Sequence, residues 1–165
     1  MRNWIPALGL VAAALAVTPA AAQLPVAIEL RLDAGIPVEE TGELYDVGPG
    51  FGVRASLEVA PTFALYGGYS QFNLEVDEDV LPDGELELSG FELGGRVGIG
   101  SGGGGAGSPY FLLGALFQDN DTGIEAGIGV DYPVSWQVSV TPEVRYRKMD
   151  DLDYITIGMG ARFRF

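Results

Sequence analysis

Residues 155–165 read ITIGMGARFRF, and this stretch decides the fold because apolar residues alternate with polar or small ones along its whole length. Every second residue from Ile155 to Phe165 is apolar, while Arg162 and Arg164 fall on the other face with a threonine and two glycines. A period of two is typical of a β-strand that separates two different environments. Helical spacing of apolar residues is absent after residue 23.

The same alternation recurs in segments that precede this stretch. They lie at about residues 25–33, 51–59, 63–70, 88–99, 110–117, 124–132 and 136–147. The segment from Tyr110 to Phe117 is apolar on both faces, so its phase stays open. Pro142 cannot donate a hydrogen bond to a neighbouring strand, and it predicts either a bulge or a shifted strand start. The sequence therefore predicts an all-β fold, a closed up-and-down antiparallel transmembrane β-barrel of about eight strands.

Two features favour a barrel in lipid over a soluble sandwich, whose apolar face would be buried. First, aromatic residues of the apolar face gather near strand ends, as expected for rings at two membrane interfaces. One predicted girdle holds Phe63, Phe111, Tyr132, Trp136, Phe163 and Phe165, and the other holds Phe51, Tyr69, Phe91, Phe117 and Tyr146. Second, the polar face combines arginine with glycine, as a narrow lumen requires, because small residues make room for large ones.

The connections between the expected strands predict the orientation of the barrel. Four of them hold 16 of the 23 acidic residues, at about residues 35–50, 73–87, 118–123 and 148–153. Two of the others are short and contain Pro61 and Pro133. Long outer loops and short periplasmic turns are the outer-membrane pattern. The glycine-rich residues 100–108 depart from it, with the composition of a flexible linker.

The first 22 residues are predicted to be a signal peptide. Arg2 gives a positive start, residues 7–17 are apolar, and Ala20-Ala21-Ala22 fits a small-residue cleavage site. A retained anchor helix is the less favoured alternative. The barrel domain is then expected over residues 23–165.

Composition excludes several function classes. The net charge of −14 argues against nucleic acid as a partner. The chain has no histidine and no cysteine, which removes the common nucleophilic and metal sites. Carboxylate pairs of the glycosidase kind have no supporting motif. The acidic stretch over residues 77–87 misses the EF-hand pattern, and a solvated loop is favoured over a calcium site. We expect no enzyme activity, no cofactor and no metal site.

Three segments carry a family resemblance: FALYGGYSQF at 63–72, EVRYRKMDD at 143–151 and GMGARFRF at 158–165. With the signal peptide, they resemble the small bacterial outer-membrane β-barrel superfamily of the OmpA/OmpX type. The resemblance implies a monomer in the outer membrane of a Gram-negative bacterium, without the peptidoglycan-binding domain of OmpA. It also implies contact with outer-membrane lipid and lipopolysaccharide, and with periplasmic chaperones and the barrel-assembly machinery during biogenesis. Phe163 and Phe165 match the family's assembly signal.

The polar face carries charges of both signs that are expected to meet in the lumen. They are Glu29, Arg31, Arg54, Glu58, Glu92, Arg96, Glu125, Glu143, Arg145, Arg147, Arg162 and Arg164. A packed ion-pair network is favoured over a gated pore or proton path, because eight strands enclose little more than their own side chains. Glu29 and Arg162 are expected to be neighbours, because the first and last strands must pair to close the barrel.

The favoured function is a structural or surface-interaction protein with a lumen plugged by Arg and Glu side chains. Its acidic extracellular loops would contact an unidentified ligand, if they bind one. A narrow outer-membrane pore or transporter is the alternative. A soluble periplasmic lipocalin-like binder is a second alternative, which predicts that the apolar face points inward.

Phe165→Asp is predicted to leave export intact and to block stable insertion. Export depends on residues 1–22, whereas insertion requires the last strand to pair with the first before lipid can surround it. The variant should accumulate in the periplasm as a protease-sensitive species that lacks heat-modifiability on a gel. Normal levels of a folded variant in the outer membrane would instead make Phe165 an ordinary interface residue.

Overall fold

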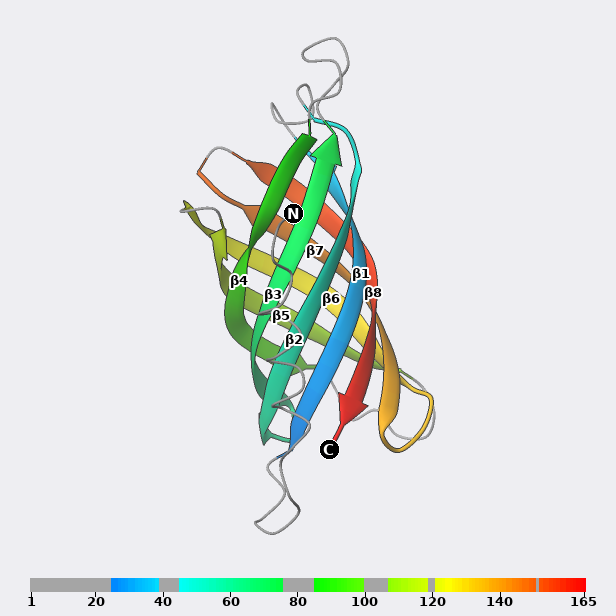
Figure 1. The fold of residues 1–165 in the computed structure, drawn as a ribbon. Helices are drawn as coiled ribbons and strands as arrows, with labels where there is room; N and C mark the ends of the chain where they lie inside the picture. Colours follow the sequence, from blue (N-terminus) through cyan, green and yellow to red (C-terminus); the bar gives the residue numbers. More distant parts are fainter. Residues whose placement is uncertain (1–24, 39–44, 76–84, 100–106, 119–120, 151) are drawn as a thin grey trace, which may run out of the picture.

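The structure, a computed structural model, describes residues 25–38, 45–75, 85–99, 107–118, 121–150 and 152–165, and these residues form a closed barrel (Figure 1). Each strand pairs with the next in an antiparallel manner, and the last pairs with the first. The strands are β1 (Val26–Pro37), β2 (Gly48–Ala60), β3 (Phe63–Glu75), β4 (Glu85–Gly98), β5 (Ser108–Gln118), β6 (Asp121–Pro133), β7 (Val138–Lys148) and β8 (Asp153–Arg164). The predicted fold class is therefore confirmed.

The pairing of β1 with β8 closes the sheet and removes its two edges. It runs without interruption from Ala27 opposite Arg164 to Pro37 opposite Tyr154. Glu29 lies directly opposite Arg162 in this register, as predicted. Phe165 extends the pairing, since its backbone N–H donates to the carbonyl oxygen of Val26 at 3.0 Å.

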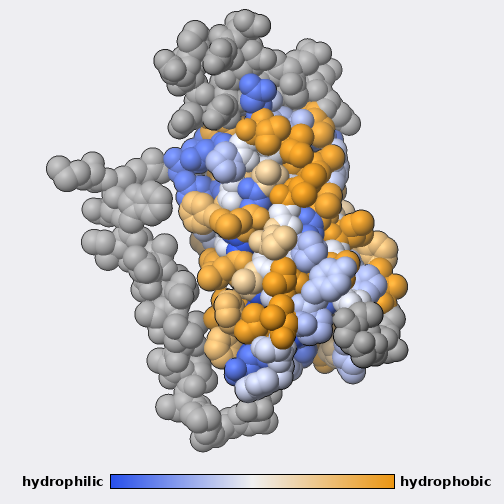
Figure 2. All heavy atoms as spheres, turned by 90° about the vertical axis from the view of Figure 1, so that its right-hand side faces the viewer, coloured by the Kyte–Doolittle hydropathy of each residue, from blue (hydrophilic) through white to orange (hydrophobic). Residues whose placement is uncertain are grey.

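The two faces of each strand are sorted as the alternation predicted. Large apolar side chains such as Leu32, Phe91 and Leu113 are exposed, and Figure 2 shows hydrophobic residues gathered over the outer wall. Charged side chains such as Glu29 and Arg145 are buried inside. The soluble lipocalin-like alternative is wrong on this point, because the apolar face points outward. Among the described residues, no helix is long and apolar enough to cross a membrane.

The structure also fixes the phase of β5, which the sequence left open. Tyr110, Leu112 and Leu116 point inward and are buried, whereas Phe111 and Phe117 are exposed. The hydroxyl of Tyr110 explains the choice, because it donates a hydrogen bond to Glu143 Oε2 at 2.7 Å inside the barrel. Turning this strand over would leave that buried carboxylate with one partner fewer.

Two details of the ladder differ from the expectation. The β6–β7 register is the same on both sides of Pro142, so there is no bulge; the two ladder positions opposite Val130 and Asp131 are simply unpaired. A proline without an N–H can leave such a gap without inserting a residue. β7 starts at Val138, two residues later than expected. A register shift does occur in β2, between Glu58 and Ala60.

The barrel has two distinct ends. We call the end with connections 38–47, 76–84, 119–120 and 149–152 the loop end, and the end with β1's start and β8's finish the terminus end. Strands reach further toward the loop end than the sequence predicted, because Gly35 pairs with Gly48 and Asn73 with Glu87 beyond the alternating apolar segments. The predicted signal peptide (1–22), most of the glycine-rich segment (100–106) and much of the acidic stretch (76–84) lie outside the described residues.

Ile128→Arg is predicted to lower the free energy of unfolding by about 2–4 kcal/mol, because Ile128 lies near the middle of β6 on the outward face that the sequence assigns to lipid. Thr122→Arg is the matched control, since Thr122 is exposed on the same face near the loop end of β6, where the cost falls to about 0–1 kcal/mol. Urea unfolding in lipid vesicles measures both. Equal costs at the two positions would argue against lipid on this face.

Candidate functional site: the charged barrel interior

The middle of the barrel interior holds one connected set of ionic side chains. We call it the central network, and it consists of Glu29, Arg31, Asp33, Arg54, Glu92, Glu125, Glu143, Arg145 and Arg147. Its arginines come from β1, β2 and β7, and its carboxylates from β1, β4, β6 and β7. Period-two alternation places each side chain inside, and barrel closure brings distant strands together.

Arg145 is the most connected member of the central network and is 1% exposed. Its Nη2 lies 3.0 Å from Asp33 Oδ2, and its Nη1 lies 3.0 Å from Glu92 Oε2 and 3.2 Å from Glu125 Oε2. Its Nε lies 3.1 Å from Glu143 Oε1. One guanidinium therefore joins carboxylates of four strands, and a planar fork of five donors suits this role better than a lysine amine would.

Glu92 is a carboxylate of the central network that contacts three arginines. Its Oε1 accepts from Arg54 Nε at 2.8 Å, and its Oε2 accepts from Arg147 Nη2 at 2.5 Å. Arg145 donates to the same Oε2 at 3.0 Å. A carboxylate that is 4% exposed and meets three guanidinium groups is compensated for the loss of water.

Tyr66 and two glycines beside it complete the central network. The hydroxyl of Tyr66 donates to Glu125 Oε1 at 2.7 Å, and Arg54 stacks on the Tyr66 ring at 4.6 Å. A Cβ atom added at Gly94 or at Gly114 would lie 2.5 Å from the Tyr66 hydroxyl oxygen. Glycine at these two positions is what lets the ring cross the lumen, in agreement with the predicted role of inward glycines.

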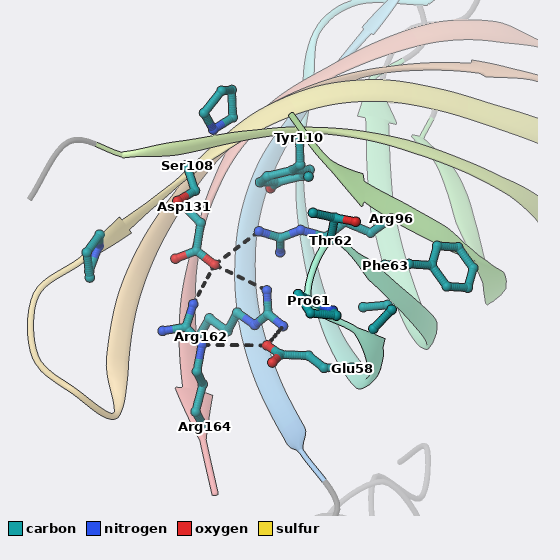
Figure 3. Close-up of a pocket in the computed structure, with 15 residues that line it drawn as sticks. Glu58, Pro61, Thr62, Phe63, Arg96, Ser108, Tyr110, Asp131, Arg162 and Arg164 are labelled. Carbon is teal, nitrogen blue, oxygen red and sulfur yellow. Dashed lines mark hydrogen bonds and ion pairs between the residues drawn. The ribbon is translucent and has the colours of Figure 1, made fainter. Parts of the chain in front are cut away.

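A second group of charges lies at the terminus end. We call it the mouth cluster, and it consists of Glu58, Arg96, Asp131, Arg162 and Arg164 (Figure 3). These residues line a cavity of about 440 Å³ together with residues of the turn at 60–62. The interior is therefore filled by side chains in its middle and hollow at this end.

The loop end of the interior is apolar. We call its buried residues the apolar cap: Phe72, Leu74, Leu88, Leu116, Met149, Leu152 and Tyr154. The rings of Phe72 and Tyr154 meet edge to face, with centroids 5.7 Å apart. The sequence did not predict the apolar cap, because inward positions near strand ends were expected to be polar. The interior thus changes from apolar to ionic to hollow along the barrel axis.

All twelve predicted lumen residues belong to the central network or the mouth cluster. The prediction omitted Asp33 and Asp131, although both stand on the predicted polar face. Both aspartates follow the same period-two alternation as the predicted lumen residues of their strands, and this pattern could have placed them in the predicted network. With them, the central network has four arginines and five carboxylates, and the mouth cluster has three arginines and two carboxylates. The interior charges cancel only when both groups are added together.

The position of Phe163 and Phe165 agrees with an outward-facing pair, since both side chains are exposed beside β1. Their predicted role in assembly stays a prediction.

Glu29 and Arg162 are register partners, but their charges pair elsewhere: Glu29 Oε1 with Arg31 Nη1 at 2.5 Å, and Arg162 with Glu58 and Asp131. Facing across two strands therefore does not decide every ion pair, although Glu125 and Arg147, which face each other across β6 and β7, do pair at 3.2 Å.

Comparison with known proteins identifies relatives of this architecture. The family model described as outer membrane protein beta-barrel domain matches residues 7–165. Among solved structures, the attachment invasion locus protein Ail of Yersinia pestis has a TM-score of 0.62 at 21% identity, covering 87% of this chain and 100% of that one. Neisserial surface protein A has a TM-score of 0.67 at 12% identity, covering 85% and 97%.

The N-terminal barrel domain of Pseudomonas aeruginosa OprF is a third similar structure, with a TM-score of 0.61 at 15% identity, covering 87% of this chain and 98% of that one. At these identities the likeness shows the fold alone. A comparison with curated protein sequences gave no significant match.

Arg145→Met is predicted to lower the free energy of unfolding by about 3–5 kcal/mol, because it leaves the carboxylates around it buried without their shared cation. Arg164→Met should cost about 0–1 kcal/mol, since the Arg164 side chain is 31% exposed and water can replace its contacts. Equilibrium unfolding in urea compares the two variants. A cost at Arg145 no larger than that at Arg164 would show that the central network does not stabilise the barrel.

Proposed function

Since the chain belongs to the outer membrane protein β-barrel domain family, we propose that it is an outer-membrane scaffold. In this proposal the barrel is closed to ions, and the loop end displays acidic connections at the cell surface. The protein is a monomer in lipid, and its loops approach lipopolysaccharide. No catalytic step is part of this role.

The observation that carries the proposal is the burial of the central network. Arg145, Arg147 and Glu125 are each at most 1% exposed, and both arginines of β7 reach Glu92 on β4, on another side of the barrel. An ion passing this level would have to replace several charge-assisted hydrogen bonds at once. The apolar cap adds a second barrier, because the hydroxyl of Tyr154 is its one hydroxyl group and already donates to Gln118 Oε1 at 2.9 Å.

A narrow pore is the second candidate, and one observation favours it. The cavity at the terminus end leaves part of the lumen unfilled, so a path needs to cross only the central network and the apolar cap. The scaffold and pore functions therefore differ in whether these two layers stay closed in a membrane.

Conductance in planar lipid bilayers separates the two functions. The scaffold proposal predicts no steady single-channel steps from the refolded protein. Arg145→Ser combined with Leu116→Ala, which shortens one side chain in each layer, should produce small steps or transient openings. A gel that compares heated and unheated samples confirms insertion of both proteins. Steady steps from the unaltered protein would overturn the closed barrel and favour the pore.

Surface display can be tested directly, because the chain has no cysteine. Asp46→Cys places a thiol at an exposed position at the loop end, and Thr62→Cys places one at the exposed turn of the terminus end. A maleimide too large to enter the cell should label Asp46→Cys in intact cells, and Thr62→Cys only after lysis. The reverse pattern would invert the barrel and remove the surface role of the acidic loops.

A further inference from the structure

We propose that the cavity at the terminus end binds a small organic oxyanion, a carboxylate or a phosphate monoester with an apolar body, through Arg96, Arg162 and Arg164. The cavity volume of about 440 Å³ lies within the range of small-molecule sites, roughly 300–1,000 Å³. The scaffold role uses the outer wall, the central network and the loops, so this site is a function beyond it.

The charge balance of the mouth cluster favours an anion. Three guanidinium groups face two carboxylates there, whereas the central network has the opposite excess. One carboxylate oxygen accepts hydrogen bonds from all three arginines. Asp131 Oδ2 lies 3.0 Å from Arg96 Nη2, 3.2 Å from Arg162 Nη1 and 2.7 Å from Arg164 Nη2. Figure 3 shows the three arginines converging on this oxygen.

The hydrogen-bond donors of the mouth cluster exceed its acceptors. Each guanidinium has five N–H donors. Beyond Asp131, the described acceptors are Ser56 and Glu58 for Arg162, and Ser139 for Arg164. The buried Nε of Arg162 has no described partner, and neither has the acceptor Asp131 Oδ1, so the donor excess comes from the three guanidinium groups taken together. Added oxyanion oxygens would satisfy these donors in the bidentate geometry that arginine favours.

The walls of the cavity suit an organic anion better than an inorganic one. Pro61, Ala64 and the ring of Tyr110 contribute apolar surface, whereas Phe63 points away from the arginines (Figure 3). Arg96 lies over the Tyr110 ring at 3.4 Å, which fixes the plane of its guanidinium. An apolar body can therefore be buried while its charged head meets the arginines.

The site is reachable from the terminus end. The side chains of Glu58 and Arg164 are 40% and 31% exposed, so the mouth is open to solvent. The net charge of the whole chain is −14, and its long-range field repels anions. Saturable anion binding would therefore require a local site of the kind that the mouth cluster provides.

The test is a titration of the refolded full-length protein in a zwitterionic detergent at low salt, followed by calorimetry and by the NMR signals of the arginine Nε–H groups. Phenyl phosphate and benzoate are the probes, and benzyl alcohol is the neutral control with the same ring. We expect saturable binding of at least one anion with shifts at Arg96, Arg162 and Arg164, and the tighter anion identifies the head group. Benzyl alcohol should give no such shifts.

Three variants make the test specific. Arg164→Gln should weaken binding roughly tenfold, because it removes one charge-assisted contact. Asp131→Asn should strengthen binding by a similar factor, since it removes the carboxylate that competes for the same donors. Lys148→Gln, which removes a cation at the opposite end of the barrel, should leave binding unchanged.

Several results would overturn the proposal: no saturable anion binding, equally tight binding of benzyl alcohol, or equal weakening by Lys148→Gln. Weaker binding by a folded Asp131→Asn would do the same. Heat-modifiability reports whether each variant is folded. If Asp131→Asn fails to fold, Arg164→Gln decides alone, because Arg164 lies at the solvent-exposed rim.

Discussion

Buried charge needs a buried partner, and this requirement governs the interior of the barrel. Five arginines are at most 3% exposed: Arg31, Arg54, Arg145, Arg147 and Arg162. A guanidinium removed from water without a carboxylate would cost several kcal/mol, more than one hydrogen bond returns. The central network meets the requirement by sharing carboxylates among arginines from different strands, as Glu92 does with Arg54, Arg145 and Arg147.

The outer wall follows from the same alternation that fills the interior. Each strand exposes one face and encloses the other, so an apolar outer wall and a charged interior are two results of one sequence period. Closure between β1 and β8 then satisfies backbone groups that a lipid environment could not solvate. The inward glycines at 94 and 114 belong to this arrangement, because they create the space that Tyr66 occupies.

Sequence alone predicted what depends on period two: the strands, their faces and the residues that reach the interior. It predicted the partners less well. Asp33 and Asp131 stand in the right phase, but their importance appears only once Arg145 and Arg162 are placed around the barrel. Ion pairs depend on the register of every strand pair and on the reach of long side chains.

What the sequence left open or missed has similar causes. β5 is apolar on both faces, so only the contact between Tyr110 and Glu143 reveals its phase. Of the two expectations at Pro142, a bulge or a shifted strand start, the bulge is absent, because the ladder leaves two positions unpaired instead of inserting a residue. The apolar cap was missed because Phe72 and Leu74 point inward near the loop end, where they pack against Tyr154 instead of meeting lipid or water.

The most direct test of this account is a double-mutant cycle on Arg145 and Glu92, whose Nη1 and Oε2 atoms lie 3.0 Å apart. The free energy of unfolding in lipid vesicles would be measured for Arg145→Gln, Glu92→Gln and the double variant. Charge balance predicts that Arg145→Gln is the costlier single change, since the central network already has one carboxylate in excess. It also predicts that Glu92→Gln partly rescues Arg145→Gln, with a coupling energy of about 0.5–3 kcal/mol. Additive costs, with no rescue, would contradict the claim that charge pairing holds the interior together.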